Sequence, residues 1–168
     1  RSSDLSTPRM GERALNVLDD MSNWGARKRI MGEVDVFKID STHELYSHMN
    51  INYVRLPSLP SFDRRDDLIS AVRRGDFFVS TGEVLLPEVK ISAGSKDRIT
   101  VAASIRNNFP LQMAESVWGD GKETYRKTFP LTDSTPFGTI NFMGEADAKG
   151  WKWARFAVWD VAANGAFV

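Results

Sequence analysis

The stretch Ile99-Thr100-Val101-Ala102-Ala103-Ser104-Ile105-Arg106 alternates larger apolar residues with smaller or polar ones. This period of two is typical of a strand with one buried face, because successive side chains of a strand point to opposite sides. Further short apolar runs follow Gly82, separated by turn residues, at 88–92, 111–118, 123–129, 139–143 and 151–161. Six short strands at this spacing predict an antiparallel β-sandwich over residues 83–168.

Two details inside these runs refine the prediction. Asp120-Gly121 stands between two runs and is a strong hairpin signal, because glycine readily takes the positive φ that such turns require. Trp151, Trp153 and Trp159 share one face of the last predicted strand. That pattern favours a core between two sheets, with a sugar-stacking platform as the alternative, and we expect Trp118 to be the most exposed tryptophan.

Residues before 83 predict helices and short strands. Apolar residues at three- and four-residue spacing favour a helix over 8–21. A second helix is predicted over 61–75, with Ser61 or Asp63 as its cap and Gly75 as its left-handed stop. Strands are predicted over 34–40 and 77–81. The expected fold class is therefore α+β, with a helix-rich segment over 1–82 followed by the antiparallel β-sandwich.

Composition excludes several classes of function. The 168 residues include 22 Lys and Arg and 22 Asp and Glu, so the net charge gives no reason to expect nucleic acid or a membrane as partner. The chain has no cysteine, which excludes disulfides, thiolate metal sites and thiol nucleophiles. It begins at Arg1 without a signal-peptide pattern, so we expect a mature product or a fragment, and the compartment stays open.

The densest group of polar residues holds both histidines of the chain. Its members are Asp35, Asp40, His43, Glu44, His48, Asn50, Asn52 and Tyr53. Imidazole and carboxylate groups together make a ligand set for zinc, iron or manganese. His43 and His48 are five residues apart, however, and a metalloprotease helix places its histidines four apart. The alternatives are a structural role, with Asp40 capping a short helix, and acid–base chemistry shared by a histidine and Glu44.

From this group, His43 and Glu44 are the catalytic candidates, and Asp40, His48, Asn50 and Tyr53 are the binding candidates. A second candidate site is the strand exit Ser80-Thr81-Gly82-Glu83, where Glu83 and backbone amides could face a cleft. The alternative there is a plain turn that needs glycine for its geometry. The basic run Arg27-Lys28-Arg29 is compatible with an anion contact, and solvated surface charge is the alternative reading.

Several stretches carry a resemblance to a known family. They are Gly32-Glu33-Val34-Asp35-Val36-Phe37, His43-Glu44-Leu45-Tyr46, the run from Ala71 to Gly75 with Phe77 to Glu83, and Trp153-Ala154-Arg155-Phe156-Ala157-Val158-Trp159-Asp160. With them the chain resembles the late part of PHP-type (polymerase and histidinol phosphatase-like) metal-dependent hydrolases. The resemblance is to the bacterial subgroup that ends in a β-sandwich, and it spans about residues 32–168.

The resemblance implies a parent protein with an irregular barrel that binds up to three divalent metals and hydrolyses phosphoesters, other esters or amides. The His-x-His ligand pair of that family would lie upstream, and this chain contains neither that pair nor the later Asp-x-His motif. We therefore expect the carboxy-terminal portion of a hydrolase without a complete catalytic centre. Its partner would be the remainder of the parent hydrolase or a small-molecule substrate, and a divalent metal would belong to the parent.

Two other functions stay open. One is a noncatalytic β-sandwich module that binds carbohydrate or protein, and the other is a small metalloenzyme built on the group around His43.

Overall fold

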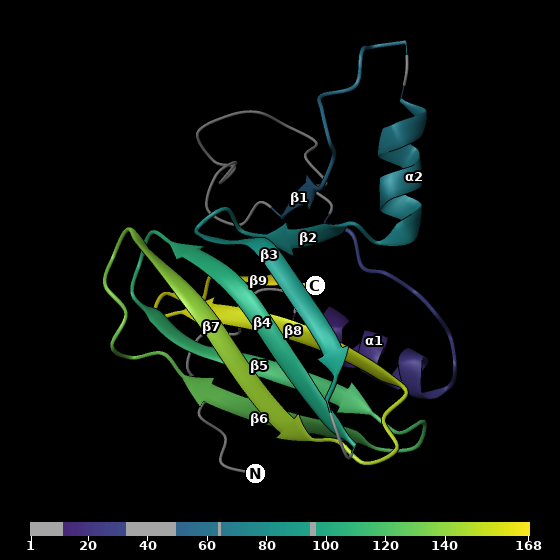
Figure 1. Ribbon diagram of the computed structural model, residues 1–168, viewed down its shortest axis with the longest axis vertical. Coiled ribbons are helices and arrows are strands. Elements are labelled where there is room, and N and C mark those ends of the chain that lie inside the picture. Colours follow the sequence, from purple (N-terminus) through teal and green to yellow (C-terminus); the bar gives the residue numbers. More distant parts are fainter. Residues whose placement is uncertain (1–11, 33–49, 64, 95–96) are drawn as a thin grey trace.

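The computed structural model describes residues 12–32, 50–63, 65–94 and 97–168 (Figure 1). The helices within these ranges are α1 (Glu12–Asn23) and α2 (Asp66–Arg74). The strands are β1 (Ile51–Val54), β2 (Phe77–Ser80), β3 (Val84–Ala93), β4 (Arg98–Asn107), β5 (Leu111–Gly119), β6 (Thr124–Pro130), β7 (Gly138–Asp147), β8 (Trp153–Asp160) and β9 (Gly165–Phe167).

The described strands form two antiparallel sheets that face each other. The larger sheet has the order β1-β2-β9-β8-β5-β6, and the smaller has the order β3-β4-β7. Figure 1 shows the smaller sheet in front of the larger one, with α1 behind. The predicted α+β class with an antiparallel β-sandwich is therefore confirmed. Within the described residues, no helix is long and apolar enough to cross a membrane.

The main core lies between the two sheets. In β4 the alternation predicted from the sequence is observed, because Ile99, Val101 and Ile105 are almost fully buried. Phe156 of β8 faces them from the larger sheet and stacks on Phe142 of β7, with ring centroids 5.3 Å apart. Apolar faces of both sheets thus close on each other, as the period of two requires.

A second, smaller core lies on the outer face of the larger sheet, under α1. It contains Leu15 of α1 together with Val79, Ala157, Trp159 and Phe167 of the sheet. The helix predicted over 8–21 corresponds to α1, whose described residues extend to Asn23. The larger sheet therefore has apolar residues on both faces, because it separates the sandwich core from the helix.

Strands β1 and β2 extend the larger sheet with residues that precede the predicted sandwich. β2 pairs with β9 through Val79 and Ser80, and β1 pairs with the other edge of β2. The division into segments 1–82 and 83–168 stays a prediction. The strand predicted over 34–40 lies outside the described residues.

The predicted C-terminal end of helix α2 is confirmed, whereas its predicted N-terminal cap is wrong. Gly75 has a φ of 86°, and its backbone N–H donates to the carbonyls of Ala71 and Val72, as a left-handed stop requires. The predicted caps Ser61 and Asp63 are wrong, because the helix begins at Asp66 with Arg65 in the capping position. Asp66 and Asp67 in the first turn still favour the positive end of the helix.

The predicted hairpin at Asp120-Gly121 is confirmed as the turn between β5 and β6. Gly121 has a φ of 94°, and the carboxylate of Asp120 accepts the backbone N–H groups of Lys122 and Glu123 at 2.8 and 2.9 Å. These hydrogen bonds lower the pKa of the Asp120 carboxyl below its ordinary value, and the bond from the Glu123 N–H has the largest effect.

Candidate functional site

A buried ion-pair network fixes α1 to the outer face of the larger sheet. The Arg155 guanidinium of β8 donates to both carboxylate oxygens of Asp19 at 2.7 and 2.8 Å, and to Glu115 of β5 at 3.3 Å. Burial by itself would lower the pKa of Arg155, but its hydrogen bonds to Asp19 and the charges of Asp19 and Glu115 raise that pKa above its ordinary value. Arg155 is therefore a charged structural bridge between helix and sheet.

Asn23 provides a second attachment at the end of α1. Its side-chain oxygen accepts the indole N–H of Trp153 at 2.9 Å and the backbone N–H of Gly121 at 3.2 Å, while its amide nitrogen donates to Thr124 Oγ1 at 2.9 Å. Gly119 leaves room for this contact, because a Cβ there would overlap the Asn23 oxygen and the Trp153 indole. Leu15, Asp19 and Asn23 are four residues apart, so all three lie on one face of the helix.

We expect Asn23→Ala to lower the free energy of unfolding by about 1–3 kcal/mol, because two N–H donors lose their acceptor. Urea denaturation followed by circular dichroism measures this change. Asn16→Ala is the matched control, since Asn16 is exposed on the same helix. Equal unfolding free energies for the two variants would contradict the role given to Asn23.

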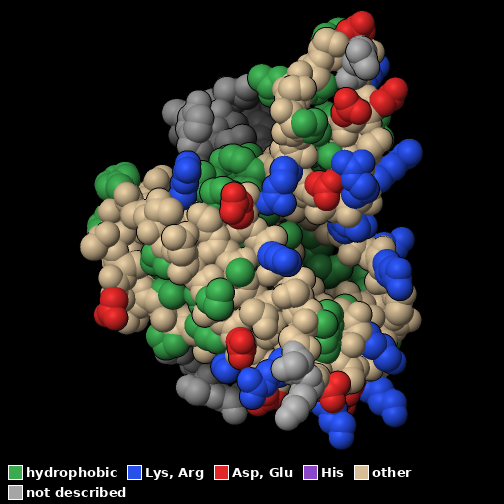
Figure 2. Space-filling model, viewed as in Figure 1, with side chains coloured by type: hydrophobic (Ala, Val, Ile, Leu, Met, Phe, Trp, Pro, Cys, Tyr) green, Lys and Arg blue, Asp and Glu red, His purple; other side chains and the backbone are tan. Residues whose placement is uncertain are grey.

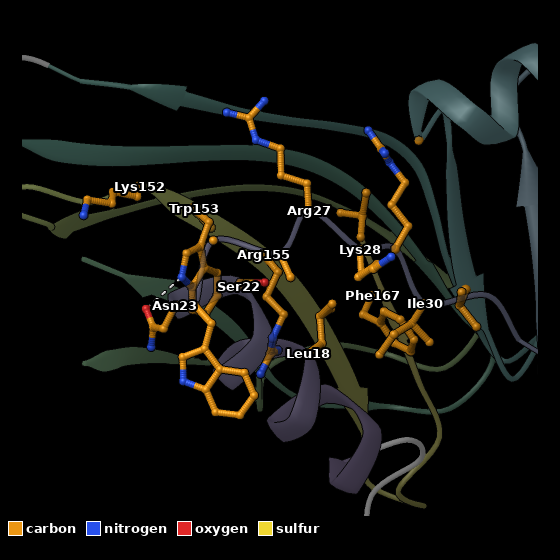
Figure 3. A pocket seen from close by; sticks show the side chains of 18 of the residues that line it. Leu18, Ser22, Asn23, Arg27, Lys28, Ile30, Lys152, Trp153, Arg155 and Phe167 are labelled. Carbon is orange, nitrogen blue, oxygen red and sulfur yellow. Dashed lines mark hydrogen bonds between the residues drawn. The ribbon is translucent and has the colours of Figure 1, made fainter. Parts of the chain in front are cut away.

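A hollow of about 760 Å³ opens beside this attachment. Its floor is the outer face of the larger sheet, with Phe77, Trp153 and Phe167 among the lining residues, and its wall is the segment 24–30 that follows α1. Figure 2 shows the hollow at one edge of the molecule, with Lys and Arg side chains around it. Figure 3 shows Lys152 on one side of Trp153, with Arg27 and Lys28 on the other.

Hydrogen bonds at several points hold the wall of this hollow in place. Near α1, the backbone N–H of Ala26 donates to the carbonyl of Met21 at 2.9 Å. In the middle, the Arg29 guanidinium donates to the carbonyl of Arg74 at 2.6 Å. Beyond it, the side-chain oxygen of Asn52 in β1 accepts the backbone N–H of Gly32, and the side-chain amide of Asn52 donates to the Gly32 carbonyl, both at 2.8 Å. The predicted basic run 27–29 is thus positioned along the rim of the hollow.

The residues proposed from the sequence fall into two sets. Asp40, His43, Glu44 and His48 lie outside the described residues, so their roles stay predictions. In the described part of the chain, no group of three or more His, Cys, Asp and Glu side chains is placed to hold a metal ion.

The three described candidates have distinct surroundings. Tyr53 stacks on Phe78 of β2 with ring centroids 4.9 Å apart. Glu83 accepts the side-chain amide N–H of Asn108 at 2.6 Å and so joins the β2–β3 turn to the β4–β5 loop. The side-chain oxygen of Asn50 is buried with no hydrogen-bond partner among the described residues. The structure therefore gives Tyr53 and Glu83 packing and bracing contacts, and it does not bring these three residues into the hollow.

The Ser80-Thr81-Gly82-Glu83 exit forms a closed turn. The Ser80 hydroxyl donates to the carbonyl of Val84 and accepts the N–H of Gly82 at 2.8 Å, and Ser80 is fully buried. Gly82 has a φ of 99°, which explains the need for glycine. The geometry therefore favours the plain turn over a cleft at this exit.

The tryptophans differ from expectation in two respects. Trp118 is buried rather than exposed, because its inner-face position in β5 packs in the main core and Tyr125 stacks on it. Trp24 is the exposed one, at 81%. Trp153 and Trp159 share the outer face of β8, whereas Trp151 precedes the strand and packs against the main core.

The three polar or indole groups that mark the last strand all have structural partners. Trp153 binds Asn23, Arg155 binds Asp19, and the Asp160 carboxylate accepts the backbone N–H groups of Ala162 and Asn164 in the β8–β9 turn. Trp153 and Arg155 thus attach α1 to the outer face of β8, and Asp160 stabilises the turn that leads from β8 to β9. These three residues of the last predicted strand therefore have structural roles in the sandwich.

Sequence reasoning missed Asp19, Asn23 and Lys152. A signal for Asp19 existed, because it is a carboxylate on the apolar face of the predicted helix. Lys152 had none, since its place in the same lining as Arg27 depends on the tertiary fold.

Comparison with protein-family models gives no match to this chain, and comparisons with curated proteins and with solved structures give none either.

Proposed function

We propose that this chain is the carboxy-terminal portion of a metal-dependent hydrolase related to the PHP type, acting on a phosphoester or a related ester or amide. In this proposal the β-sandwich closes the catalytic part of the parent protein, and this chain alone lacks a complete catalytic centre. The stretches of resemblance quoted above, from Gly32 to Asp160, suggest the family.

The observation that carries the proposal is the surface around α2. Helix α2 and the loop before it stand away from the sheets at one end of the molecule (Figure 1). Three of their large apolar side chains remain exposed, with Leu59 at 94%, Phe62 fully exposed and Ile69 at 43%. Exposed apolar groups gathered at one end favour contact with further protein. In the proposal, that protein is the remainder of the hydrolase.

The connection from α2 into the sandwich gives further support. Only Gly75 and Asp76 separate α2 from β2, and β2 is paired with both β1 and β9. A structure packed against α2 would therefore be tied to the sandwich through a short connection. This arrangement suits a closing element that holds its neighbour in a fixed position.

The test compares this chain with the full product of its gene. We expect the full product to hold divalent ions and to hydrolyse p-nitrophenyl phosphate or p-nitrophenyl acetate with Mn²⁺ or Zn²⁺. We expect this chain alone to do neither, as measured by metal analysis after dialysis and by p-nitrophenolate release.

Two results would overturn the proposal. One is a full gene product with no metal-dependent hydrolysis. The other is one tightly held divalent ion per molecule of this chain, lost in His43→Ala, which would instead support a small metalloenzyme built on the group around His43.

A further inference from the structure

We propose that the hollow between α1, the segment 24–30 and the outer face of the larger sheet binds a small organic anion with a flat apolar body. The anionic group would be a phosphate or carboxylate at the basic rim, and the body would be an aromatic ring against the floor. This site does not depend on the hydrolase proposal, because it uses none of the residues around His43.

The charged side chains of the lining are all basic. Lys and Arg occupy five lining positions, namely Arg27, Lys28, Arg29, Lys152 and Arg155, and the described lining includes no Asp or Glu. Arg155 is occupied by its two carboxylates and Arg29 by the carbonyl of Arg74. Within the described residues, the side chains of Arg27, Lys28 and Lys152 have no hydrogen-bond or ion-pair partner. An anion at the rim could thus bind a cation there without displacing an existing acceptor.

The floor offers the apolar half of the site. Phe77, Val79 and Phe167 line it from β2 and β9, and Trp153 lines it from β8. The Trp153 ring is oriented by its hydrogen bond to Asn23, which Figure 3 shows as a dashed line. An indole held in this way presents a flat surface on which another planar ring can stack.

Size and rigidity agree with a small-molecule site. A volume of about 760 Å³ falls in the usual range for ligand pockets, which is roughly 300–1,000 Å³. The wall is already held by Met21, Arg74 and Asn52, so the backbone that carries Arg27 and Lys28 needs little further ordering on binding. A preorganised backbone of this kind lowers the entropic cost of binding.

The experiment titrates this chain with phenyl phosphate and follows indole fluorescence and binding heat. We expect saturable binding that weakens as salt increases. Benzyl alcohol, which keeps the ring without the charge, and inorganic phosphate, which keeps the charge without the ring, should each bind about tenfold or more weakly, since each loses one half of the contacts.

The double variant Arg27→Glu/Lys28→Glu should weaken phenyl phosphate binding about tenfold or more, because attraction becomes repulsion. Lys152→Glu reverses one charge on a separate element and should weaken binding in the same direction. Lys90→Glu is the matched control for that single charge reversal, since Lys90 is exposed on β3 and is not part of the lining. Thermal unfolding of each variant checks that the fold is kept.

Several outcomes would overturn the inference. They are the absence of saturable phenyl phosphate binding, unchanged affinity in both Arg27→Glu/Lys28→Glu and Lys152→Glu, and equal affinity for benzyl alcohol or for inorganic phosphate. None of them bears on the metal content of the full gene product, so failure here and failure of the hydrolase proposal are distinguishable.

Discussion

Replacing Arg155 with methionine should lower the free energy of unfolding by about 3–5 kcal/mol, because it leaves the buried carboxylate of Asp19 without its counter-charge. The side chains of Arg155 and Asp19 are only 6% and 5% exposed. In the variant Asp19 loses two hydrogen bonds, and Glu115 retains Arg126 at 3.5 Å as an ion-pair partner. Urea denaturation followed by circular dichroism measures the loss.

Two further variants separate the buried charge from the substitution itself. Arg106→Met removes an exposed arginine from β4 and should change stability by less than about 0.5 kcal/mol. Asp19→Leu/Arg155→Met removes both partners and should be more stable than Arg155→Met alone, because Asp19 is no longer buried without its partner. If Arg155→Met were no less stable than Arg106→Met, the network would not be holding the helix.

Phe156→Ala should also lower the free energy of unfolding by about 3–5 kcal/mol, because it opens a cavity between the two sheets. Phe156 is fully buried in the main core, where it stacks on Phe142. Phe142 in turn meets Phe129 of β6 edge-on, with ring centroids 5.2 Å apart. The substitution therefore removes one ring from a series of three aromatic rings, joined by two contacts, that connects the sheets.

The control for Phe156→Ala is Phe62→Ala, which makes the same chemical change at a fully exposed position. Urea denaturation gives the free energy of unfolding of both variants. The control should stay within about 0.5 kcal/mol of the unsubstituted protein. Phe156→Leu should be intermediate, since it refills part of the space. Similar losses for Phe156→Ala and Phe62→Ala would mean that the two sheets do not share the packed core described above.

The sandwich could be predicted from the sequence because most of its strands are long enough to display their period. β4 and β7 pair over ten residues, and β4 alternates buried and less buried positions along most of its length. A strand of three or four residues is too short to display a period of two clearly. β9 has three residues, and β1 has four, of which Asn52 appeared to belong to a polar site.

The candidate site was less predictable because it depends on contacts between distant residues. The sequence revealed the basic run 27–29, but only the fold brings Lys152 and Trp153 into the lining of the same hollow. The burial of Trp118 was missed for a similar reason. Its place near a hairpin suggested exposure, while pairing with both Tyr125 and Ala154 puts it inside the sheet.

The attachment of α1 also constrains the order in which the chain can fold. Asp19 and Asn23 bind partners that lie 136 and 130 residues further along the chain. Synthesis makes α1 before β8, so the ion pair of Asp19 and the indole hydrogen bond of Asn23 cannot form until β8 has emerged. Contacts of such sequence separation form slowly, because a long loop must close first. The nascent helix therefore lacks these two attachments while the intervening residues are made, a period in which a chaperone could bind its apolar side.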